Sequence, residues 1–494
     1  MCVFFYNFNI VILLYEKRRP LFTMKGKKYL FLAAAILSMG TLAGCGNTND
    51  ATTLNVVCFN GGFGREWIDD AVKIWEAENP GYKIDLNATK DATSIISGNI
   101  AKKNNKDDVY IAVDTNWKRY AGQGKLLALD DLLEEEVDGL KVKDKINDEY
   151  KNSIYFKDQT GETHTYRLPW TAGTGGIMYN AKMFEDNGWK VPTTTAELLA
   201  LCQSMIDHPI YTDPTDKTSP RVYPFAYTGE NTDYFDYAVF NWWGQISGVD
   251  AINEFKKYGK DDAGKFDAFT NETYAGLKTA TETWYQIFGN PAYSDPEDIS
   301  RNNHIAQKNF LQGKAAMMIN GDWLYNEMLT YSTDHTLPEN FELKIMDTPK
   351  IVENAEKSGY IIGEDQFIAI PRSTTKAELA KSFVKTLISD EVLKSFFNKG
   401  HGMMAYKLGN GTYETDNVYM KSLVDYRTNL EKTYTSFSSS LLFLNGQVDL
   451  WGAPAGRPYL QLLQGTLKSV DAAFEQIRDD VARQWGTWVG NANM

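Results

Sequence analysis

Residues 310–323 read FLQGKAAMMINGDW, and this stretch carries the strongest indication of the fold. Its middle, Ala315–Ile319, is an apolar run of the length and composition of a buried β-strand. Gly321 would allow the chain to leave this strand sharply, because glycine has no side chain to restrict its backbone. We therefore expect Asp322 and Trp323 to project from a strand end. The alternative is that Trp323 lies in the core.

A second informative block lies upstream. It begins with Tyr166-Arg167-Leu168-Pro169-Trp170 and continues through Tyr179-Asn180, Phe184, Gly188-Trp189 and Pro192-Thr193. The first block resembles the F-x-x-G-K-A-A-M-x-x-x-G-x-W signature of family 1 extracellular solute-binding proteins, the receptors of carbohydrate ABC importers. The second block resembles the crossing segment of that family. The resemblance implies an α/β, two-lobe, periplasmic-binding-protein-like fold, each lobe a mixed sheet flanked by helices, with the ligand in the interlobe cleft.

The length of the chain agrees with two domains, since a single hydrophobic core stops growing at about 250–300 residues. With a hinge and more than one crossing implied by the resemblance, we expect four segments. Residues 54–171 begin the first lobe, 172–319 begin the second, 320–370 return to the first, and 371–494 complete the second.

The N-terminal region resembles a bacterial lipoprotein signal peptide. Residues 24–44 join a lysine-rich start to a short apolar run, and Leu42–Cys45 resembles a lipobox, which implies lipidation of Cys45. Residues 1–23 are interpreted as a mis-start upstream of the true start at Met24, with a two-helix membrane hairpin as the alternative. Residues 45–53 have the composition of a polar tether. The alternative for Cys45 is an ordinary signal peptide with a chance cysteine.

Composition excludes several classes of partner. The formal net charge of −13 argues against nucleic acid, because phosphate binding depends on clustered Lys and Arg. Cys58 and Cys202 are the two cysteines after Cys45, too few for a disulfide framework. The five His residues show no metal-binding spacing, so we expect no metal and no cofactor. An aromatic content of 13% favours a sugar-handling protein, because ring faces stack on pyranoses.

The first part of the chain predicts alternating strands and helices. Leu54–Phe59 and Asp108–Val113 are apolar strands, Tyr82, Ile84 and Leu86 alternate as another, and residues 68–75 have helical spacing. This order is typical of a parallel α/β sheet. Two further helix starts are predicted by capping-box spacing, at Thr194 with Glu197 and at Thr375 with Glu378.

The loop Asn60–Gly64 follows the first strand, where α/β folds bind ligands. It is not a dinucleotide loop, because Trp67 stands where the third glycine is required. Asn60 and Gly62 are candidate ligand contacts, and a plain tight turn is the alternative. Asp114 and Asn116 follow another strand end, where a carboxylate can accept two hydroxyl groups. Glu66 and Asp236 are lesser candidates.

Several aromatic residues are candidate sugar platforms. Trp170 precedes Gly173-Thr174-Gly175-Gly176 at the expected first crossing, where a hinge role and ligand contact both remain open. In the cluster from Tyr234 to Trp243 we favour Trp242 for the pocket, since adjacent side chains point to different sides. The resemblance also suggests a second-lobe aromatic at Trp451, with Arg457 as a binding or bracing residue.

The combined expectation is a monomeric, lipid-anchored, extracytoplasmic receptor attached to the cell membrane. It would capture a mono- or oligosaccharide by hinge closure and deliver it to the permease subunits of an ABC importer, without being an enzyme. The alternative is a secreted carbohydrate-active hydrolase, which would pair two carboxylates across the scissile bond. A third hypothesis, a surface adhesin, would leave the two-lobe architecture unexplained.

Overall fold

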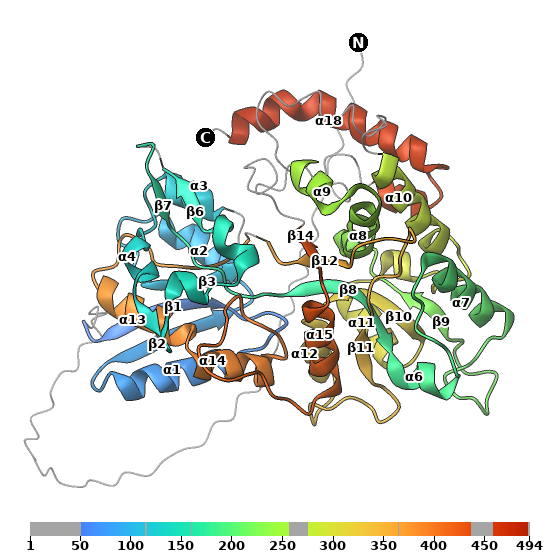
Figure 1. Cartoon of the computed structure of the whole chain (residues 1–494), viewed down its shortest axis with the longest axis horizontal. Helices are drawn as coiled ribbons and strands as arrows, with labels where there is room; N and C mark the ends of the chain where they lie inside the picture. Colours follow the sequence, from blue (N-terminus) through green and yellow to red (C-terminus); the bar gives the residue numbers. More distant parts are fainter. Residues whose placement is uncertain are drawn as a thin grey trace, which may run out of the picture. The chain divides into compact units, whose positions relative to one another are not determined.

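The computed structural model describes residues 51–113, 116–158, 160–255, 275–363, 365–435 and 458–492. The predicted signal peptide, Cys45 and most of the predicted tether lie outside these ranges. Within the described ranges, none of the helices combines the length and the apolar character that a membrane span requires. The described part contains two separate mixed sheets, each covered by helices (Figure 1), so the predicted α/β, two-lobe fold is confirmed.

The first lobe is built on a four-stranded sheet whose strand order is β13-β3-β1-β2. Strand β1 runs parallel to β2 and β3, while β13 is antiparallel to β3. The bounds of these strands are β1 Thr53–Phe59, β2 Lys83–Thr89, β3 Val109–Val113 and β13 Gln366–Ala369. Strands β1, β2 and β3 match the three strands that the apolar patterns of the sequence predicted.

Helices and two small hairpins complete the first lobe. The longer helices are α1 Glu66–Glu78, α2 Ala92–Ile100 and α13 Ala377–Leu387, and the short helix α14 Asp390–Ser395 is followed directly by η6 Phe396–Gly400. The shorter helices are α3 Trp117–Gly122, α4 Asp130–Leu133, α5 Val142–Lys145 and η1 Asp148–Ser153. The hairpin strands are β4 Glu136–Val137, β5 Leu140–Lys141, β6 Tyr155–Lys157 and β7 Thr163–Thr165.

The second lobe is built on a sheet with the order β14-β12-β8-β10-β9, in which β11 also pairs with β8. Its bounds are β8 Thr174–Asn180, β9 Tyr223–Ala226, β10 Ala315–Gly321, β11 Leu343–Ile345, β12 Ser358–Ile361 and β14 Lys432–Tyr434. Every residue of β8 and β10 is buried, because both strands have neighbours on either side and helices over their faces. Strand β10 contains the predicted strand Ala315–Ile319.

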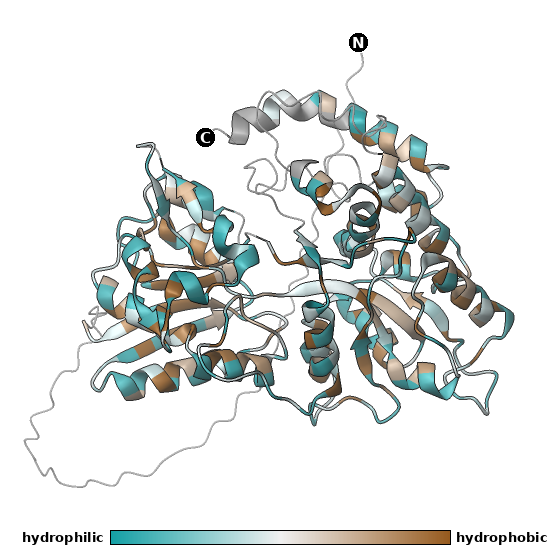
Figure 2. Ribbon diagram, in the orientation of Figure 1, coloured by the Kyte–Doolittle hydropathy of each residue, from teal (hydrophilic) through white to brown (hydrophobic). Residues whose placement is uncertain are grey.

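Many helices cover the second sheet. They are α6 Ala181–Asp186, α7 Thr195–Asp207, α8 Asp236–Ser247, α9 Val249–Phe255, α10 Ala275–Phe288, α11 Asn303–Leu311, α12 Leu324–Leu329, α15 Val418–Thr428, α17 Pro458–Leu463 and α18 Val470–Ala492, with short η2 Thr232–Phe235 and η5 Asp298–Ser300. Figure 2 shows hydrophilic and hydrophobic residues side by side on helices such as α7 and α15, as expected for helices with one buried face.

Within the described ranges, the chain passes between the lobes three times. In the first lobe Leu168 exchanges two backbone hydrogen bonds with Ile368, of 2.9 and 2.8 Å, and six residues after Leu168 Thr174 begins β8 of the second lobe. The return falls between the end of β12 and the start of β13. The third passage lies between Tyr406, which is paired with Ile146, and α15.

The predicted bounds of the later segments are wrong. Residues 320–370 were expected to return to the first lobe, but β11 and β12 in this range both pair with β8 in the second. Conversely α13 and α14 belong to the first lobe although 371–494 was assigned to the second, whereas β13 lies within 320–370 and joins the first lobe as predicted. The physical reason is that strand pairing over long sequence distances decides lobe membership, and the local sequence pattern does not report it.

Candidate functional site

Trp323 lies where the two lobes meet. It is the second residue after β10 and is partly exposed, and it packs against the hydrophobic cores of both lobes. From the first lobe Phe63 meets it edge-on at 6.5 Å between ring centroids; from the second, Tyr234 and Tyr237 lie at 5.9 and 6.4 Å. Trp323 is therefore partly buried between the two cores, and its contact with a ligand stays a prediction.

The glycine loop after β1 touches Trp323. A Cβ added to Gly62 would lie 2.6 Å from the Cβ of Trp323, closer than two carbons can approach without a shift. The side chain of Asn326 donates a hydrogen bond of 2.8 Å from Nδ2 to the carbonyl oxygen of Gly62. The loop of the first lobe and the start of α12 in the second lobe thus form one junction.

Glu327 is a polar member of this junction that the sequence reasoning missed. Its Oε2 accepts a hydrogen bond of 2.6 Å from Nε2 of Gln307, and its Oε1 lies 3.1 Å from the position of a Cβ on Gly62. Burial raises the pKa of Glu327, against the opposing effects of Gln307 and Lys90. The available signal was its spacing, because residues i and i+4 share one helix face and Glu327 follows Trp323 by four.

Asp322 is buried between the end of β10 and the start of β8 and does not face solvent. Its side chain is 1% exposed, and both carboxylate oxygens lack a hydrogen-bond partner within the described residues. Its backbone N–H donates to the Thr174 carbonyl at 2.9 Å, and Tyr419 Oη donates to its carbonyl at 2.7 Å. Burial raises the pKa of Asp322 to about 7, with Arg427 opposing the shift. In this arrangement Asp322 has no surface to offer a ligand.

Trp170 belongs to the core of the first lobe. It is 2% exposed and stacks on Trp67 at 5.8 Å, while Phe59 and Phe63 approach its ring edge-on. The prediction that Trp170 contacts a ligand is not supported in this arrangement, because its ring faces are already covered. Gly173 and Gly175 beside it serve close packing, since added Cβ atoms would meet Ile362 at 2.2 Å and Tyr237 at 2.3 Å.

The prediction that one of two adjacent tryptophans is free is wrong. Trp242 and Trp243 are both 0% exposed, and Nε1 of Trp242 donates a hydrogen bond of 2.9 Å to the carbonyl of Pro349. Helix α8 is buried around its circumference from Asp236 to Gln245, so neither side of it faces solvent. From the same aromatic cluster it is Tyr234 and Tyr237 that reach Trp323.

The remaining candidates are scattered. Asn60 is partly exposed on the loop of Gly62, and its N–H donates to the Thr89 carbonyl at 3.0 Å. Glu66 is exposed in the first turn of α1, and Asn116 is partly exposed before α3. Asp236 is buried at the start of α8, where its carbonyl accepts from Tyr434 Oη at 3.2 Å. The predicted residues Asp114, Trp451 and Arg457 lie outside the described residues.

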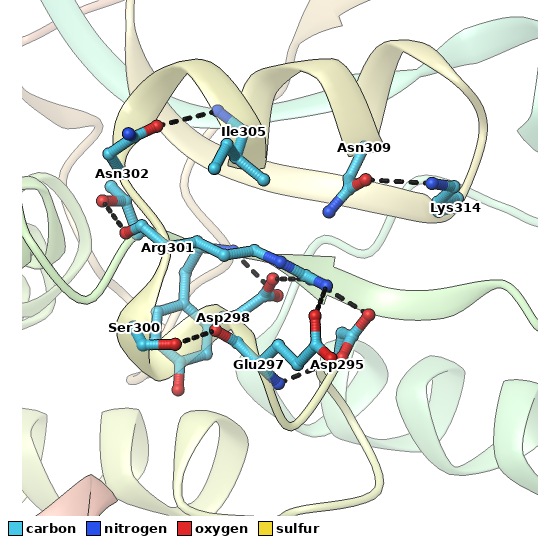
Figure 3. A network of polar contacts seen from close by, with 11 residues as sticks. Asp295, Glu297, Asp298, Ser300, Arg301, Asn302, Ile305, Asn309 and Lys314 are labelled. Carbon is cyan, nitrogen blue, oxygen red and sulfur yellow. Dashed lines mark hydrogen bonds and ion pairs between the residues drawn. The ribbon is translucent and has the colours of Figure 1, made fainter. Parts of the chain in front are cut away.

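A network of charged residues holds the loop that precedes Tyr234 (Figure 3). Arg301 makes ion pairs with Asp295 at 3.0 Å, Glu297 at 2.8 Å and Asp298 at 2.5 Å. Asp298 also accepts from the backbone N–H of Tyr227 at 3.3 Å. Burial raises the pKa of Asp298 to about 6, with Arg301 opposing the shift.

The network is connected to the loop after β9 and to Tyr234. Thr228 Oγ1 donates to the Arg301 carbonyl at 2.9 Å, and a Cβ on Gly229 would lie 1.9 Å from the Ile299 carbonyl oxygen. Nδ2 of Asn303, two residues after Arg301, donates to Tyr234 Oη at 3.3 Å. The charged network therefore positions one aromatic wall of the junction.

A pocket of 460 Å³ lies elsewhere, within the second lobe alone, and Gln245, Thr348 and Tyr426 are among its lining residues. A ligand held only there would contact one lobe. Across the part of the chain that the structure describes, no group of three His, Cys, Asp or Glu side chains has the arrangement of a metal site.

Residues 62–394 match the family of bacterial extracellular solute-binding proteins, and the chain belongs to this family. The family is one of binding proteins that work outside the cytoplasm. The predicted resemblance is therefore confirmed over most of the chain, including both sequence blocks from which it was drawn.

Individual relatives are more distant. The chain is 26% identical over 157 residues to the diacetylchitobiose binding protein NgcE of Streptomyces coelicolor, which is 31% of this chain and 32% of that protein. The chain thus matches about a third of the length of this curated relative.

Solved structures resemble the chain over much more of its length. RafE in complex with raffinose has a TM-score of 0.62 at 15% identity, covering 88% of this chain and 99% of RafE. An ABC substrate-binding protein from Listeria monocytogenes in complex with cycloalternan has a TM-score of 0.60 at 14% identity, with 88% and 99% covered. At such identities the likeness establishes the two-lobe fold.

Proposed function

We propose that this protein is a carbohydrate receptor whose lobes close around a mono- or oligosaccharide at the junction of Trp323. The observation that carries the proposal is the position of this one partly exposed aromatic ring against the cores of both lobes. The named ligands of the relatives, diacetylchitobiose, raffinose and cycloalternan, are all carbohydrates, which supports the same class of ligand here.

The chemistry of the junction suits a sugar. An indole ring offers a flat apolar face to the C–H face of a pyranose, while neighbouring polar groups take the hydroxyls. Around Trp323 these polar groups are the backbone of the glycine loop and the side chains of Asn326 and Glu327. A ligand that touches both lobes favours the closed arrangement, because only a difference in affinity between two states can shift their populations.

The receptor would deliver its ligand to the permease subunits of an ABC importer, acting as a monomer tethered to the cell membrane through Cys45. The support for the tether is the lipobox-like Leu42–Cys45 followed by a polar segment. A lipid anchor would hold the loaded receptor near the permease at high effective concentration. Mass spectrometry of the membrane-bound protein, with a Cys45→Ser control that releases it, tests this part.

The alternative function, a carbohydrate-active hydrolase, has weaker support. Such an enzyme needs two carboxyl groups about 5–10 Å apart on either side of the scissile bond. The described carboxylates next to Trp323 are Glu327 and Asp322, and Asp322 is too buried to reach a substrate. The geometry therefore favours binding without cleavage.

A thermal-shift assay with neutral mono- to tetrasaccharides tests the proposal. At least one sugar should raise the melting temperature, because a ligand that binds only the folded state stabilises it, and chromatography should recover that sugar uncleaved.

Trp323→Ala should weaken binding at least about tenfold, because losing a central aromatic contact costs about 2 kcal/mol or more. Trp189→Ala is the matched control, since Trp189 packs on Phe184 in the second lobe alone. Absence of any sugar-induced shift, or steady hydrolysis, would contradict the proposal.

A further inference from the structure

We propose that Glu327 is a ligand-binding residue of this junction, and that its Oε1 accepts a hydrogen bond from a hydroxyl or amide N–H of a neutral sugar stacked on Trp323. The inference rests on the proposed function and deepens it, because it names the chemical class of sugar that this side of the junction accepts.

The first step is the position of Glu327 on α12. The helix begins directly after Trp323, and the backbone N–H of Glu327 donates to the carbonyl oxygen of Trp323 at 3.0 Å. This i to i+4 relation places the two side chains on one face of the helix. An aromatic ring and a carboxylate on one face can contact the apolar and the hydroxyl-bearing parts of the same sugar.

The second step is that the carboxylate is held in place. Gln307 is fully buried and donates from Nε2 to Oε2 of Glu327 at 2.6 Å. The orientation of this amide is set from its other end, where Oε1 of Gln307 accepts from the hydroxyl of Tyr331. His304 lies 2.9 Å from the same hydroxyl. The carboxylate of Glu327 is therefore oriented before any ligand arrives, which lowers the entropy cost of binding.

The third step is that one carboxylate oxygen of Glu327, Oε1, can still accept hydrogen bonds. Among the described residues, the bond from Gln307 is the one hydrogen bond to the carboxylate, and it goes to Oε2. Oε1 lies 3.1 Å from the Cβ position of Gly62, so it faces the loop of the opposite lobe. A carboxylate oxygen can accept two hydrogen bonds, and this one lacks any at the place where the lobes meet.

The fourth step concerns charge. Glu327 is partly buried, and the loss of water around its carboxylate raises its pKa, against the opposing effects of Gln307 and Lys90. A partly dehydrated carboxylate gains strongly from a donor, since hydrogen bonds to charged groups are about twice as strong as neutral ones. The same carboxylate repels an acidic substituent. Neutral sugars with hydroxyl or acetamido groups therefore fit the junction better than uronic acids.

The experiment compares affinities by calorimetry. The probe is the neutral sugar with the largest thermal shift in a panel that includes raffinose and diacetylchitobiose, and digalacturonic acid is the acidic comparison. Glu327→Gln should weaken the neutral probe roughly 10- to 100-fold, because it removes a charge-assisted acceptor while keeping the shape. Glu339→Gln, an exposed position on the same lobe, should bind like the wild type.

The outcomes separate this inference from the proposed function. Wild-type affinity in Glu327→Gln together with weak binding in Trp323→Ala would overturn the inference and leave the receptor function standing. Tighter binding of digalacturonic acid than of the neutral probe would overturn it as well. A wild type that binds no sugar would overturn the function and the inference together. If Glu327→Gln does not fold, Glu327→Asp keeps the charge, shortens the reach, and should still weaken the neutral probe.

Discussion

Gly62 and Trp323 belong to different lobes, and a Cβ on Gly62 would stand 2.6 Å from the Cβ of Trp323. The absence of a side chain at residue 62 therefore allows the two lobes to meet. Because Trp323 lies in the two-residue connection between β10 and α12, it cannot move away without moving the start of α12.

Gly62→Ala should push the lobes apart at this junction. Forcing an extra methyl group into a filled contact costs about 1–3 kcal/mol, so we expect weaker sugar binding and less compaction on ligand addition in X-ray scattering. Gly98→Ala is the control, because nothing lies within 4 Å of its added Cβ and it sits within helix α2. Alanine should be neutral or mildly stabilising there. Normal closure in Gly62→Ala would contradict the close contact.

Asp322→Asn should change the pH dependence of stability in a defined direction. The pKa of Asp322 is raised from 3.8 to about 7 by burial, so between about pH 4 and pH 7 the folded state keeps a proton that the unfolded state has lost. The stability that protonated Asp322 contributes is complete below the pKa of Asp322 in the unfolded state. It is lost as the pH rises through the pKa of Asp322 in the folded state.

The asparagine variant should therefore gain stability over the wild type as the pH rises from 4 to about 7, and the difference should level off above that. Its final size should be on the order of a few kcal/mol, since each unit of pKa shift corresponds to about 1.4 kcal/mol. Melting temperatures of both proteins across pH 4–9 measure it. A difference that is independent of pH would contradict the buried placement of Asp322.

An ion pair connects the two lobes. Arg427 on α15 of the second lobe reaches Oε1 of Glu149 in the first lobe at 2.9 Å, and the guanidinium is largely buried. Glu149→Gln should destabilise the protein by about 1–3 kcal/mol, because it leaves a buried cation without its counter-ion.

Chemical denaturation of Glu149→Gln and of a surface control tests this pair. In the control, Asp186→Asn, an exposed ion pair with Lys182 is lost, and the cost should stay within about 0.5 kcal/mol. Equal effects of the two substitutions would show that the interlobe pair contributes no more than a surface pair.

Arg301→Ala should affect both stability and binding. Three carboxylates surround this guanidinium, and the most buried of them, Asp298, would lose its counter-ion. Since the same segment holds Tyr234 through Asn303, sugar affinity should fall together with the melting temperature. Asn303→Ala should lower affinity with a smaller change in melting temperature. Unchanged sugar affinity in both variants would show that the charged network does not influence binding at the junction.

Local sequence patterns predicted individual elements well. The strands around Leu54–Phe59 and Ala315–Ile319 were found because their residues alternate or run apolar in the way that a buried strand requires. Thr194 caps α7 as its spacing with Glu197 predicted, accepting from the Glu197 N–H at 3.1 Å. Thr375 does not cap α13, since the N-cap is Lys376 and the hydroxyl of Thr374 accepts its N–H at 3.0 Å.

The sequence by itself determined the family and the kinds of element, because signature residues and periodicity are local properties of the chain. Tertiary structure decided which lobe each later segment joins, that Trp170, Trp242 and Asp322 are buried, and that Glu327 stands beside Gly62. These are outcomes of contacts between residues far apart in sequence, and burial depends on what packs against a side chain from elsewhere. Trp323 is an example of both. The sequence motif identified it as a candidate, but its position against the cores of both lobes follows only from the tertiary structure.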